Sequence, residues 1–305
     1  MVEGILPIWK EKGMTSFACV SRIRYLLGIK KVGHAGTLDP EVEGVLPIAV
    51  GAGTKVLEYM LNADKTYTGE ITIGYSTSTE DATGTIIERL PVSKDIQEEE
   101  IDQVLAEFVG SIEQIPPMFS AVKVKGKKLY EYAFEGIEIE RSARKVRIDE
   151  LKKTSEIIYD EVEKTVRFSF EVSCSKGTYI RTLAVDIGKK LGYPAHMSEL
   201  TRIRSGNILA DQTYTLEEVK AALTNDNLEN LLLPIDVGLT QFTKITIDDK
   251  LWNRVKNGAL LDEEDITTEE YPVLFVYKQV IVALYDKHPK KTGKLKPLKM
   301  FKIEM

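Results

Sequence analysis

The sequence contains few of the residues that build disulfide frameworks and metal sites. Only two cysteines, Cys19 and Cys174, occur in 305 residues, and they lie far apart along the chain. A chain of this length can form a core without cross-links, so we expect both thiols to be reduced. The three histidines, His34, His196 and His288, share no ligand spacing with each other or with a cysteine. We therefore expect no bound metal.

Long apolar runs are also missing. No stretch approaches the roughly 18 consecutive apolar residues that a membrane span requires. The first residues lack the basic segment and apolar core of a secretory signal. We expect a cytoplasmic protein that has no membrane partner.

Acidic residues outnumber basic ones, and the two kinds are segregated along the chain. The formal net charge is −6, yet for nucleic-acid binding the distribution of charge matters more than its sum. Acidic residues concentrate at 95–102 and 262–270, whereas three other clusters are basic. One such cluster could be only a solvated face, but three in an acidic chain favour contacts with phosphates. The basic clusters comprise Lys123, Lys125, Lys127 and Lys128; Arg141, Arg144, Lys145 and Arg147; and Lys287, Lys290, Lys291, Lys294, Lys296, Lys299 and Lys302.

Apolar spacing predicts a helix near the N-terminus. The pattern covers residues 16–27, with Thr15 or Ser16 as the cap and Gly28 as the stop. The apolar face of this helix is expected to contain Phe17, Val20 and Ile23.

The remaining pattern predicts an α+β fold with a mixed, mostly antiparallel sheet, because strands and helices follow one another without regular βαβ alternation. Strands are predicted at 66–74 and 167–173, and a helix after the second strand carries Arg181 in its first turn. An excursion at about 123–151 contains two of the basic clusters. Short apolar strands dominate from about residue 240. We therefore expect a larger domain at 1–238 and a small β-rich domain at 239–305.

The most distinctive stretch is a glycine-punctuated loop that contains a lone carboxylate. Pro40 disfavours helical geometry at Asp39, and the glycines admit backbone angles that other residues avoid, so the carboxylate is presented from a fixed turn or extended segment. Spacing alone leaves two interpretations open: an active-site carboxylate, or an aspartate that bonds only to the backbone of its own turn. The loop reads Gly33-His34-Ala35-Gly36-Thr37-Leu38-Asp39-Pro40 and continues Glu41-Val42-Glu43-Gly44-Val45-Leu46-Pro47.

This loop resembles the catalytic-loop signature of the bacterial tRNA pseudouridine synthase B family. Four further motifs of that family, one before this loop and three after it, occur in family order, so that the resemblance runs from about residue 4 to about residue 206. Glu11 stands where proline is usual, Ala35 where threonine is frequent, and Val42-Glu43 where Ala-Thr is frequent. None of these departures involves Asp39. The further motifs lie at 10–16, 65–67, 114–123 and 174–183.

The resemblance implies an enzyme that isomerises uridine to pseudouridine at position 55, in the T-arm of tRNA, without a cofactor. It implies that Asp39 is the essential carboxylate and that Arg181 lies beside it, lowers its pKa and holds its orientation. Tyr67 would stack on the flipped uracil, while Tyr179 and Leu200 would line the pocket. We expect His34 to help extrude the base, or to contact phosphate, rather than to act as a general base.

The resemblance also implies a broad grip on RNA, because a uridine inside a folded arm must be flipped out of its stack. The larger domain would be a pseudouridine synthase catalytic domain, and the C-terminal one an RNA-binding domain of the PUA type. We expect tRNA, through its T-arm stem-loop, as the partner of a monomer. The expected RNA-contacting residues are Lys10, Lys123, Lys125, Lys127, Lys128, Arg141, Arg144, Lys290 and Lys291.

Two other classes of function remain as alternatives. One is an RNA-binding protein or tRNA-folding chaperone in which catalysis is secondary. The other is a retaining glycosidase-like hydrolase with Asp39 as its nucleophile, which requires a second carboxylate nearby. Glu41 and Glu43 are the close candidates for that second group, and they follow a proline on the loop.

Overall fold

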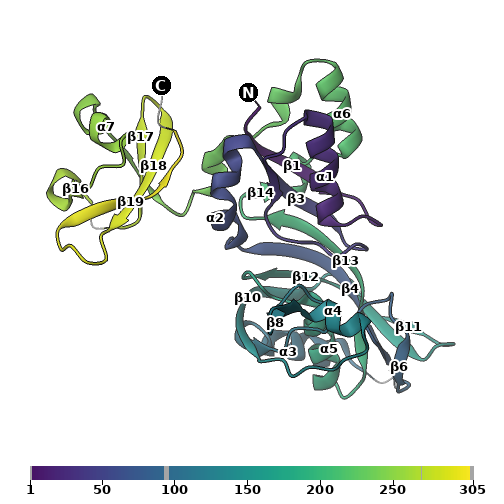
Figure 1. Ribbon diagram of the computed structural model, residues 1–305. Coiled ribbons are helices and arrows are strands. Elements are labelled where there is room, and N and C mark those ends of the chain that lie inside the picture. Colours follow the sequence, from purple (N-terminus) through teal and green to yellow (C-terminus); the bar gives the residue numbers. More distant parts are fainter. Residues whose placement is uncertain (1, 93–95, 269, 303–305) are drawn as a thin grey trace.

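The structure is a computed structural model that describes residues 2–92, 96–268 and 270–302. A large sheet runs through its centre (Figure 1). In spatial order its strands are β1 (Gly4–Lys10), β3 (Glu43–Val50), β13 (Ala195–Ser205), β4 (Lys65–Ile73), β12 (Thr165–Cys174), β10 (Arg144–Lys153) and β7 (Gly110–Gln114). Three short strands extend it: β2 (Val32–His34) pairs with β3, β14 (Ile208–Leu209) with β13, and β11 (Ile158–Asp160) with β12.

All neighbouring strands in this order run antiparallel except β3 and β13, which run parallel. The helices α1 (Ser16–Leu27) and α6 (Leu216–Thr224) pack together at one end of the sheet. At the other end, α3 (Glu98–Glu107) packs against β10 and α5 (Ile180–Lys190) packs against β13 (Figure 1). The predicted α+β fold with a mostly antiparallel sheet is confirmed.

A second, smaller sheet lies to one side of the first (Figure 1). It contains β15 (Thr243–Thr246), β17 (Val273–Tyr277), β18 (Val280–Lys287), β19 (Lys294–Met300) and β16 (Leu261–Asp262), and α7 (Asp249–Val255) accompanies it. This β-rich character agrees with the alternation of the sequence in that region.

Apolar and polar contacts attach the smaller sheet to the rest of the chain. One buried apolar cluster contains Val56 and Met60, next to and within α2 (Leu57–Leu61), together with Leu274 and Leu284 of the smaller sheet. Beside the cluster, the ammonium of Lys55 donates to the backbone carbonyls of Met300 and Phe301 at 2.8 and 3.1 Å. The smaller sheet is therefore held against the segment at and just before the start of α2.

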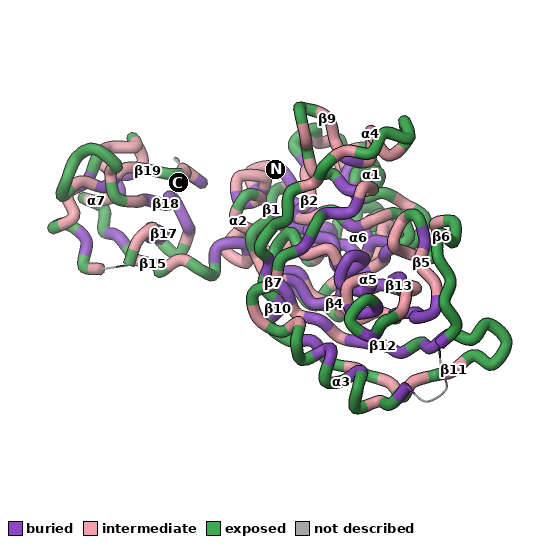
Figure 2. The backbone as a smooth tube through the Cα atoms, turned by 90° about the horizontal axis from the view of Figure 1, so that it is seen from below, coloured by how far each residue is buried: buried purple, intermediate pink, exposed green. Residues whose placement is uncertain are grey.

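Two hairpins project from the main sheet. One is formed by β5 (Tyr75–Thr77) and β6 (Ile86–Arg89), and the other by β8 (Lys123–Val124) and β9 (Lys127–Lys128). The second hairpin leads into α4 (Leu129–Phe134). Figure 2 shows β9 and α4 at the periphery, where most residues are exposed or half-buried. This part of the structure coincides with the basic excursion in the sequence.

Helix α1 has the predicted bounds, and Val20 and Ile23 of the predicted face are buried. Thr15 caps it by accepting a hydrogen bond from the Ala18 N–H at 3.0 Å, and Gly28 ends it with a φ of 65°. Phe17, expected in the core, is 63% exposed. Ser16 and Cys19 are buried instead of Phe17, and the Ser16 hydroxyl bonds to the backbone of Leu38 in the loop that carries Asp39. The residues on the buried face are Ser16, Cys19, Val20 and Ile23.

The two cysteines, Cys19 and Cys174, are buried and unpaired, as expected. Burial raises the pKa of the Cys174 thiol to about 11, so this group is protonated at physiological pH. Within the described part of the chain, no helix combines the length and the apolar character needed to cross a membrane.

Gly44 is the position where the sheet tolerates no side chain. It lies opposite Arg202 in the parallel pairing of β3 with β13, and its φ is 121°. A Cβ atom there would lie 2.2 Å from the Arg202 carbonyl oxygen, well inside contact distance. Gly110, at the start of β7, has a similar φ of 109°, but a Cβ atom added to it would meet no other atom within 4 Å. The two glycines share a backbone conformation and differ in crowding.

We predict that Gly44→Ala lowers the free energy of unfolding by at least about 2 kcal/mol more than Gly110→Ala does, because only the first adds overpacking to backbone strain. Chemical denaturation followed by circular dichroism measures both values. Equal losses in the two variants would mean that β3 and β13 can separate without cost.

Candidate active site

The loop that carries Asp39 joins β2 to β3 and is held from below by a buried lysine. Lys10, the last residue of β1, is fully buried. At distances of 2.9, 2.8 and 3.0 Å, its ammonium donates to the backbone carbonyls of Glu11, Met14 and Pro40. The RNA contact expected for Lys10 does not fit this geometry, because the side chain has neither exposed surface nor a spare donor. Lys10 instead fixes the backbone next to Asp39.

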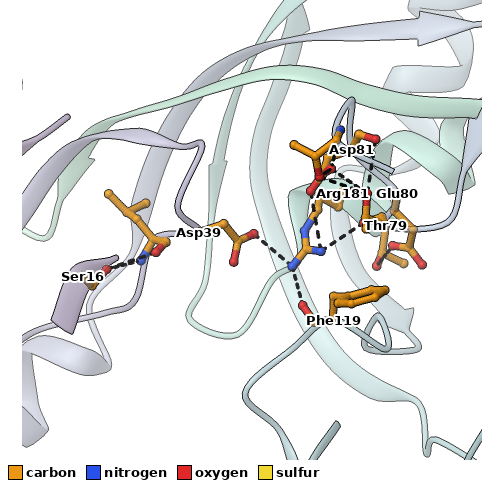
Figure 3. A network of polar contacts seen from close by, with 10 residues as sticks. Ser16, Asp39, Thr79, Glu80, Asp81, Phe119 and Arg181 are labelled. Carbon is orange, nitrogen blue, oxygen red and sulfur yellow. Dashed lines mark hydrogen bonds and ion pairs between the residues drawn. The ribbon is translucent and has the colours of Figure 1, made fainter. Parts of the chain in front are cut away.

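Asp39 and Arg181 point toward each other from opposite sides of the site (Figure 3). An Nη2 to Oδ2 distance of 2.9 Å joins the two side chains. Arg181 lies in the first turn of α5, shortly after the end of β12, as the sequence predicts. Its side chain is 7% exposed, whereas that of Asp39 is 43% exposed. The cation is thus fixed in the protein, and the carboxylate keeps an open side.

Three further groups hold the Arg181 guanidinium (Figure 3). Its Nη1 donates to the Thr79 carbonyl at 3.1 Å and its Nη2 to the Phe119 carbonyl at 2.8 Å. Oδ2 of Asp81 lies 3.9 Å from Nη1. These three residues were not predicted from the sequence. The many serines and threonines at 76–85 indicate a loop, but nothing in that segment predicts that Thr79 and Asp81 contact Arg181 of α5.

Burial raises the pKa of the Asp39 carboxyl above its ordinary value, and the Arg181 guanidinium opposes that rise. The family resemblance implied a lowered pKa; the arginine acts in that direction, but loss of solvent is the larger effect. Because 43% of the side chain remains in contact with solvent, the penalty of burial is moderated. We expect Asp39 to be ionised near neutral pH.

A cavity of about 410 Å³ opens beside Asp39, within the size range of sites for small organic groups. Tyr130 of α4 and Phe119 also line it, so the basic excursion reaches the same cavity. The structure therefore brings together the residues that the motifs placed far apart in the sequence. Those among the predicted site residues that line the cavity are Asp39, Tyr67, Tyr179, Arg181 and Leu200.

His34 ends β2 and is not among the residues that line this cavity. Burial lowers the pKa of its imidazole, and the nearby Arg202 guanidinium lowers it further. The ring is therefore neutral at physiological pH. A neutral ring is better suited to stacking or packing against a base than to a charged contact with phosphate.

The hydrolase alternative requires a second carboxylate close to Asp39. Neither Glu41 nor Glu43 lines the cavity, and Glu43 is engaged in β3, where it pairs with Thr201. Among the described residues the acid and nucleophile pair of a retaining hydrolase is therefore not assembled from these candidates.

The predicted RNA-contacting residues of the excursion lie at or near the surface. Some are engaged by the protein itself: Lys127 forms an ion pair with Glu135, and Arg141 donates to the Pro116 carbonyl at 3.0 Å. Bound RNA would compete with such internal partners. The residues concerned are Lys123, Lys125, Lys127, Lys128, Arg141 and Arg144.

Lys290 and Lys291 lie in the loop between β18 and β19, and both are exposed. Their backbone N–H groups donate to Nδ1 of His288 at 3.1 Å each. The histidine thus fixes the backbone of this loop while both lysine side chains remain accessible.

Comparison with known proteins identifies the family. Residues 24–180 match the family model described as TruB family pseudouridylate synthase (N terminal domain), and residues 181–240 match the tRNA pseudouridylate synthase B C-terminal domain. The chain belongs to the TruB family of pseudouridylate synthases. The tRNA pseudouridine synthase B of Geobacillus thermodenitrificans is 52% identical over an alignment of 307 positions, which covers 99% of this chain and 100% of that protein. The enzyme of the same name from Bacillus subtilis is 49% identical over 304 aligned positions, with 98% of each chain covered.

Solved structures with the same fold support this assignment. In the crystal structure of a Cbf5-Nop10-Gar1 complex, a chain aligns with a TM-score of 0.72 and 28% identity, over 98% of this chain and 85% of that one. The structure of an H/ACA RNP bound to a substrate RNA containing 2'-deoxyuridine aligns with a TM-score of 0.70 and 26% identity over the same shares. The predicted family resemblance is confirmed. This TruB-family chain is a pseudouridine synthase, an isomerase that converts uridine in RNA to pseudouridine.

Lys65 is a further cation in the cavity of this TruB-family enzyme. It begins β4, and its ammonium donates to the backbone carbonyls of Leu61 and Ala63 at the end of α2. Burial, reinforced by the Arg202 charge, lowers the pKa of Lys65 to about 8. In the sequence Lys65 stands out only as part of a motif, because a lysine at the start of a strand is ordinarily exposed.

We predict that Lys65 makes stability rise with pH. Its pKa is about 8 in the folded chain and 10.5 in the unfolded chain, so between these values the unfolded state binds more protons. The free energy of unfolding of the wild type, minus that of Lys65→Met, should increase by about 2 kcal/mol between pH 8 and pH 10. Denaturant titrations at several pH values measure this difference.

Taking the difference removes the groups that titrate in this window independently of Lys65. Cys174 contributes in the opposite sense, since its raised pKa makes stability fall as pH rises above about 9; because the Lys65 charge lowers that pKa, this contribution cancels in large part and not completely. A difference that stays constant from pH 8 to pH 10 would show that Lys65 keeps its ordinary pKa.

Proposed function

We propose that this enzyme isomerises the uridine at position 55, in the T-arm of tRNA, and that Asp39 is its essential carboxylate. The observation that carries the proposal is the partly exposed Asp39 carboxylate, paired with Arg181 at the edge of a cavity lined by Tyr67 and Leu200. The near-complete coverage of relatives named tRNA pseudouridine synthase B supports tRNA as the substrate.

The reaction exchanges one bond to the ribose for another. The bond between uracil N1 and the sugar C1' breaks, the base turns over, and a bond forms between C5 and C1'. C5 then loses its proton and N1 gains one, so atoms and electrons balance without an external reagent. Asp39 would assist by attacking C1' or by abstracting a ribose proton, and either role needs an ionised carboxylate beside the sugar.

Arg181 would keep the carboxylate ionised and oriented during these steps. Its other contacts, with the Thr79 and Phe119 carbonyls, prevent it from moving away when Asp39 engages the sugar. Tyr67 and Leu200 would hold the detached base in the cavity, while Tyr179 forms a further part of the wall. Exclusion of water protects such an intermediate from hydrolysis.

The RNA would be gripped at two separate surfaces. The excursion at 123–151 would close over the T-arm, because its α4 contributes Tyr130 to the cavity and its hairpin carries exposed lysines. Residues 239–305 would act as a PUA-like domain that binds the tRNA farther from Asp39, through Lys290 and Lys291. In this proposal residues 1–238 form the catalytic domain and the enzyme works as a cytoplasmic monomer.

We predict that Asp39→Asn lowers the turnover number by at least about 1,000-fold, as expected when an enzyme loses its sole nucleophile or base. An unmodified T-arm stem-loop serves as substrate, and carbodiimide labelling with primer extension shows both the extent and the position of conversion. Affinity for the RNA should change little, because asparagine retains the shape of the side chain.

Glu41→Gln is the matched control. Glu41 lies in the same loop as Asp39, but its carboxylate does not line the cavity. This variant should stay within about threefold of the wild type. RNA binding without conversion by the wild type would contradict the proposal in favour of an RNA chaperone. Conversion at another uridine would contradict the assignment of position 55.

We predict that the double variant Lys290→Ala/Lys291→Ala weakens binding of full-length tRNA and not of the isolated T-arm stem-loop. Each lost phosphate contact should reduce the slope of log Kd against log salt by about 1. Filter binding at several salt concentrations measures both RNAs. The control Lys250→Ala/Lys256→Ala removes the same charge from α7 and its end. Equal effects on the two RNAs would place these lysines on the T-arm itself.

A further inference from the structure

Arg202 lies at the point where three strands of the main sheet meet. In the middle strand, β13, it is opposite Tyr67 of β4 on one side and Gly44 of β3 on the other. Only 1% of Arg202 is exposed, which makes it one of the largest fully buried side chains in the described part of the chain. A buried guanidinium is costly unless its donors are used. Its contacts therefore indicate what it does.

Two of these contacts tie the sheet to the loop that carries Asp39. Nε of Arg202 donates to the Val45 carbonyl in β3 at 2.7 Å, and Nη2 donates to the Gly36 carbonyl at 3.0 Å. Gly36 lies in the Asp39 loop and has a φ of 96°. A Cβ atom on Gly36 would lie 3.4 Å from Nη1, so glycine lets the guanidinium lie directly under the loop. Arg202 thereby fixes the backbone of the loop at Gly36.

Arg202 also lies beside the aromatic residue of the site, since Tyr67 is its partner in the register of β13 with β4. Burial raises the pKa of the Tyr67 phenol, and Arg202 opposes this rise. Arg202 thus bonds to the loop that presents Asp39 and lies beside the tyrosine proposed to stack on uracil. Both Arg202 and Tyr67 line the cavity beside Asp39.

The charge of Arg202 is not neutralised by a carboxylate of the protein. In residues 2–92, 96–268 and 270–302, no ion pair joins Arg202 to an acidic side chain. Its field instead lowers the pKa values of Lys65 and His34, which lie close by. Arg202 therefore acts on its surroundings both through hydrogen bonds and through an uncompensated positive charge.

We propose that Arg202 is a positioning residue for pseudouridine formation, which sets the distance between the Asp39 loop and the Tyr67 ring from beneath the cavity. The inference rests on the proposed roles of Asp39 and Tyr67. Arg181 orients the Asp39 carboxylate itself, whereas Arg202 places the backbone that carries it. A displacement of about 1 Å in such a framework can cost about 100-fold in rate.

The experiment compares Arg202→Met, Arg202→Lys and Arg204→Met on the T-arm stem-loop. Arg204 is the matched control, because it lies two residues farther along β13 and bonds to Thr66 and Gly206. It lines a different cavity, of about 310 Å³. We expect kcat to fall about 100-fold in Arg202→Met and at least 10-fold in Arg202→Lys, with KM within threefold. Arg204→Met should retain kcat within threefold of the wild type.

An NMR titration separates the charge of Arg202 from its geometry. The chain has only three histidines, so the His34 signal can be assigned by substitution of the other two. Loss of the Arg202 charge should raise the pKa of His34 toward 6.5, while His196 should not respond. Arg202→Lys keeps the charge, so it should leave the His34 pKa low and still reduce kcat.

Two outcomes would overturn the proposal. One is a kcat for Arg202→Met that matches that of Arg204→Met. Should Arg202→Met not fold, Arg202→Lys decides, and wild-type kcat in that variant would overturn the inference. An inactive wild type would instead count against the proposed function, so the two failures are distinguishable.

Discussion

The ion pair between Asp39 and Arg181 is the contact around which the site is organised. A carboxylate among cavity walls loses solvent, and only a fixed cation can keep it charged without closing it off. Three carbonyls bind Lys10 beneath the loop, and the Thr79 and Phe119 carbonyls bind Arg181 on the far side. The surrounding backbone thus holds both members of the pair, which leaves the open face of Asp39 available to a substrate.

A second constraint concerns the basic side chains: the protein is acidic overall, yet it must bind RNA, which is a polyanion. Several cations are occupied within the chain: Lys127 by Glu135, Arg147 by Asp64, and Lys294 by Asp262. Exposed ion pairs of this kind contribute little to stability. Phosphates can therefore replace the carboxylates at small cost, and the net charge of −6 does not prevent RNA binding.

Local patterns predicted the elements of this chain better than they predicted contacts between them. The caps Thr15 and Gly28 specified the bounds of α1, but Phe17 is exposed and its neighbour Ser16 is buried, where it bonds to a loop distant in sequence. The motifs placed Asp39 and Arg181 together through resemblance, which carries long-range information that spacing lacks. Lys10 was misjudged because its carbonyl partners form only after the loop folds over β1. Arg202 was missed for a related reason, since its contacts depend on which strands flank β13.

The contacts that hold the smaller sheet near α2 bear on the length of RNA that the enzyme would accept. Lys55 and the apolar cluster fix that sheet to the same helix whose end is bonded by Lys65 in the cavity. The distance between the loop at Lys290 and the Asp39 carboxylate is therefore set by packing within the protein. Under the proposed function, an RNA arm that is one base pair longer or shorter than the T-arm would contact one of these two surfaces and not the other.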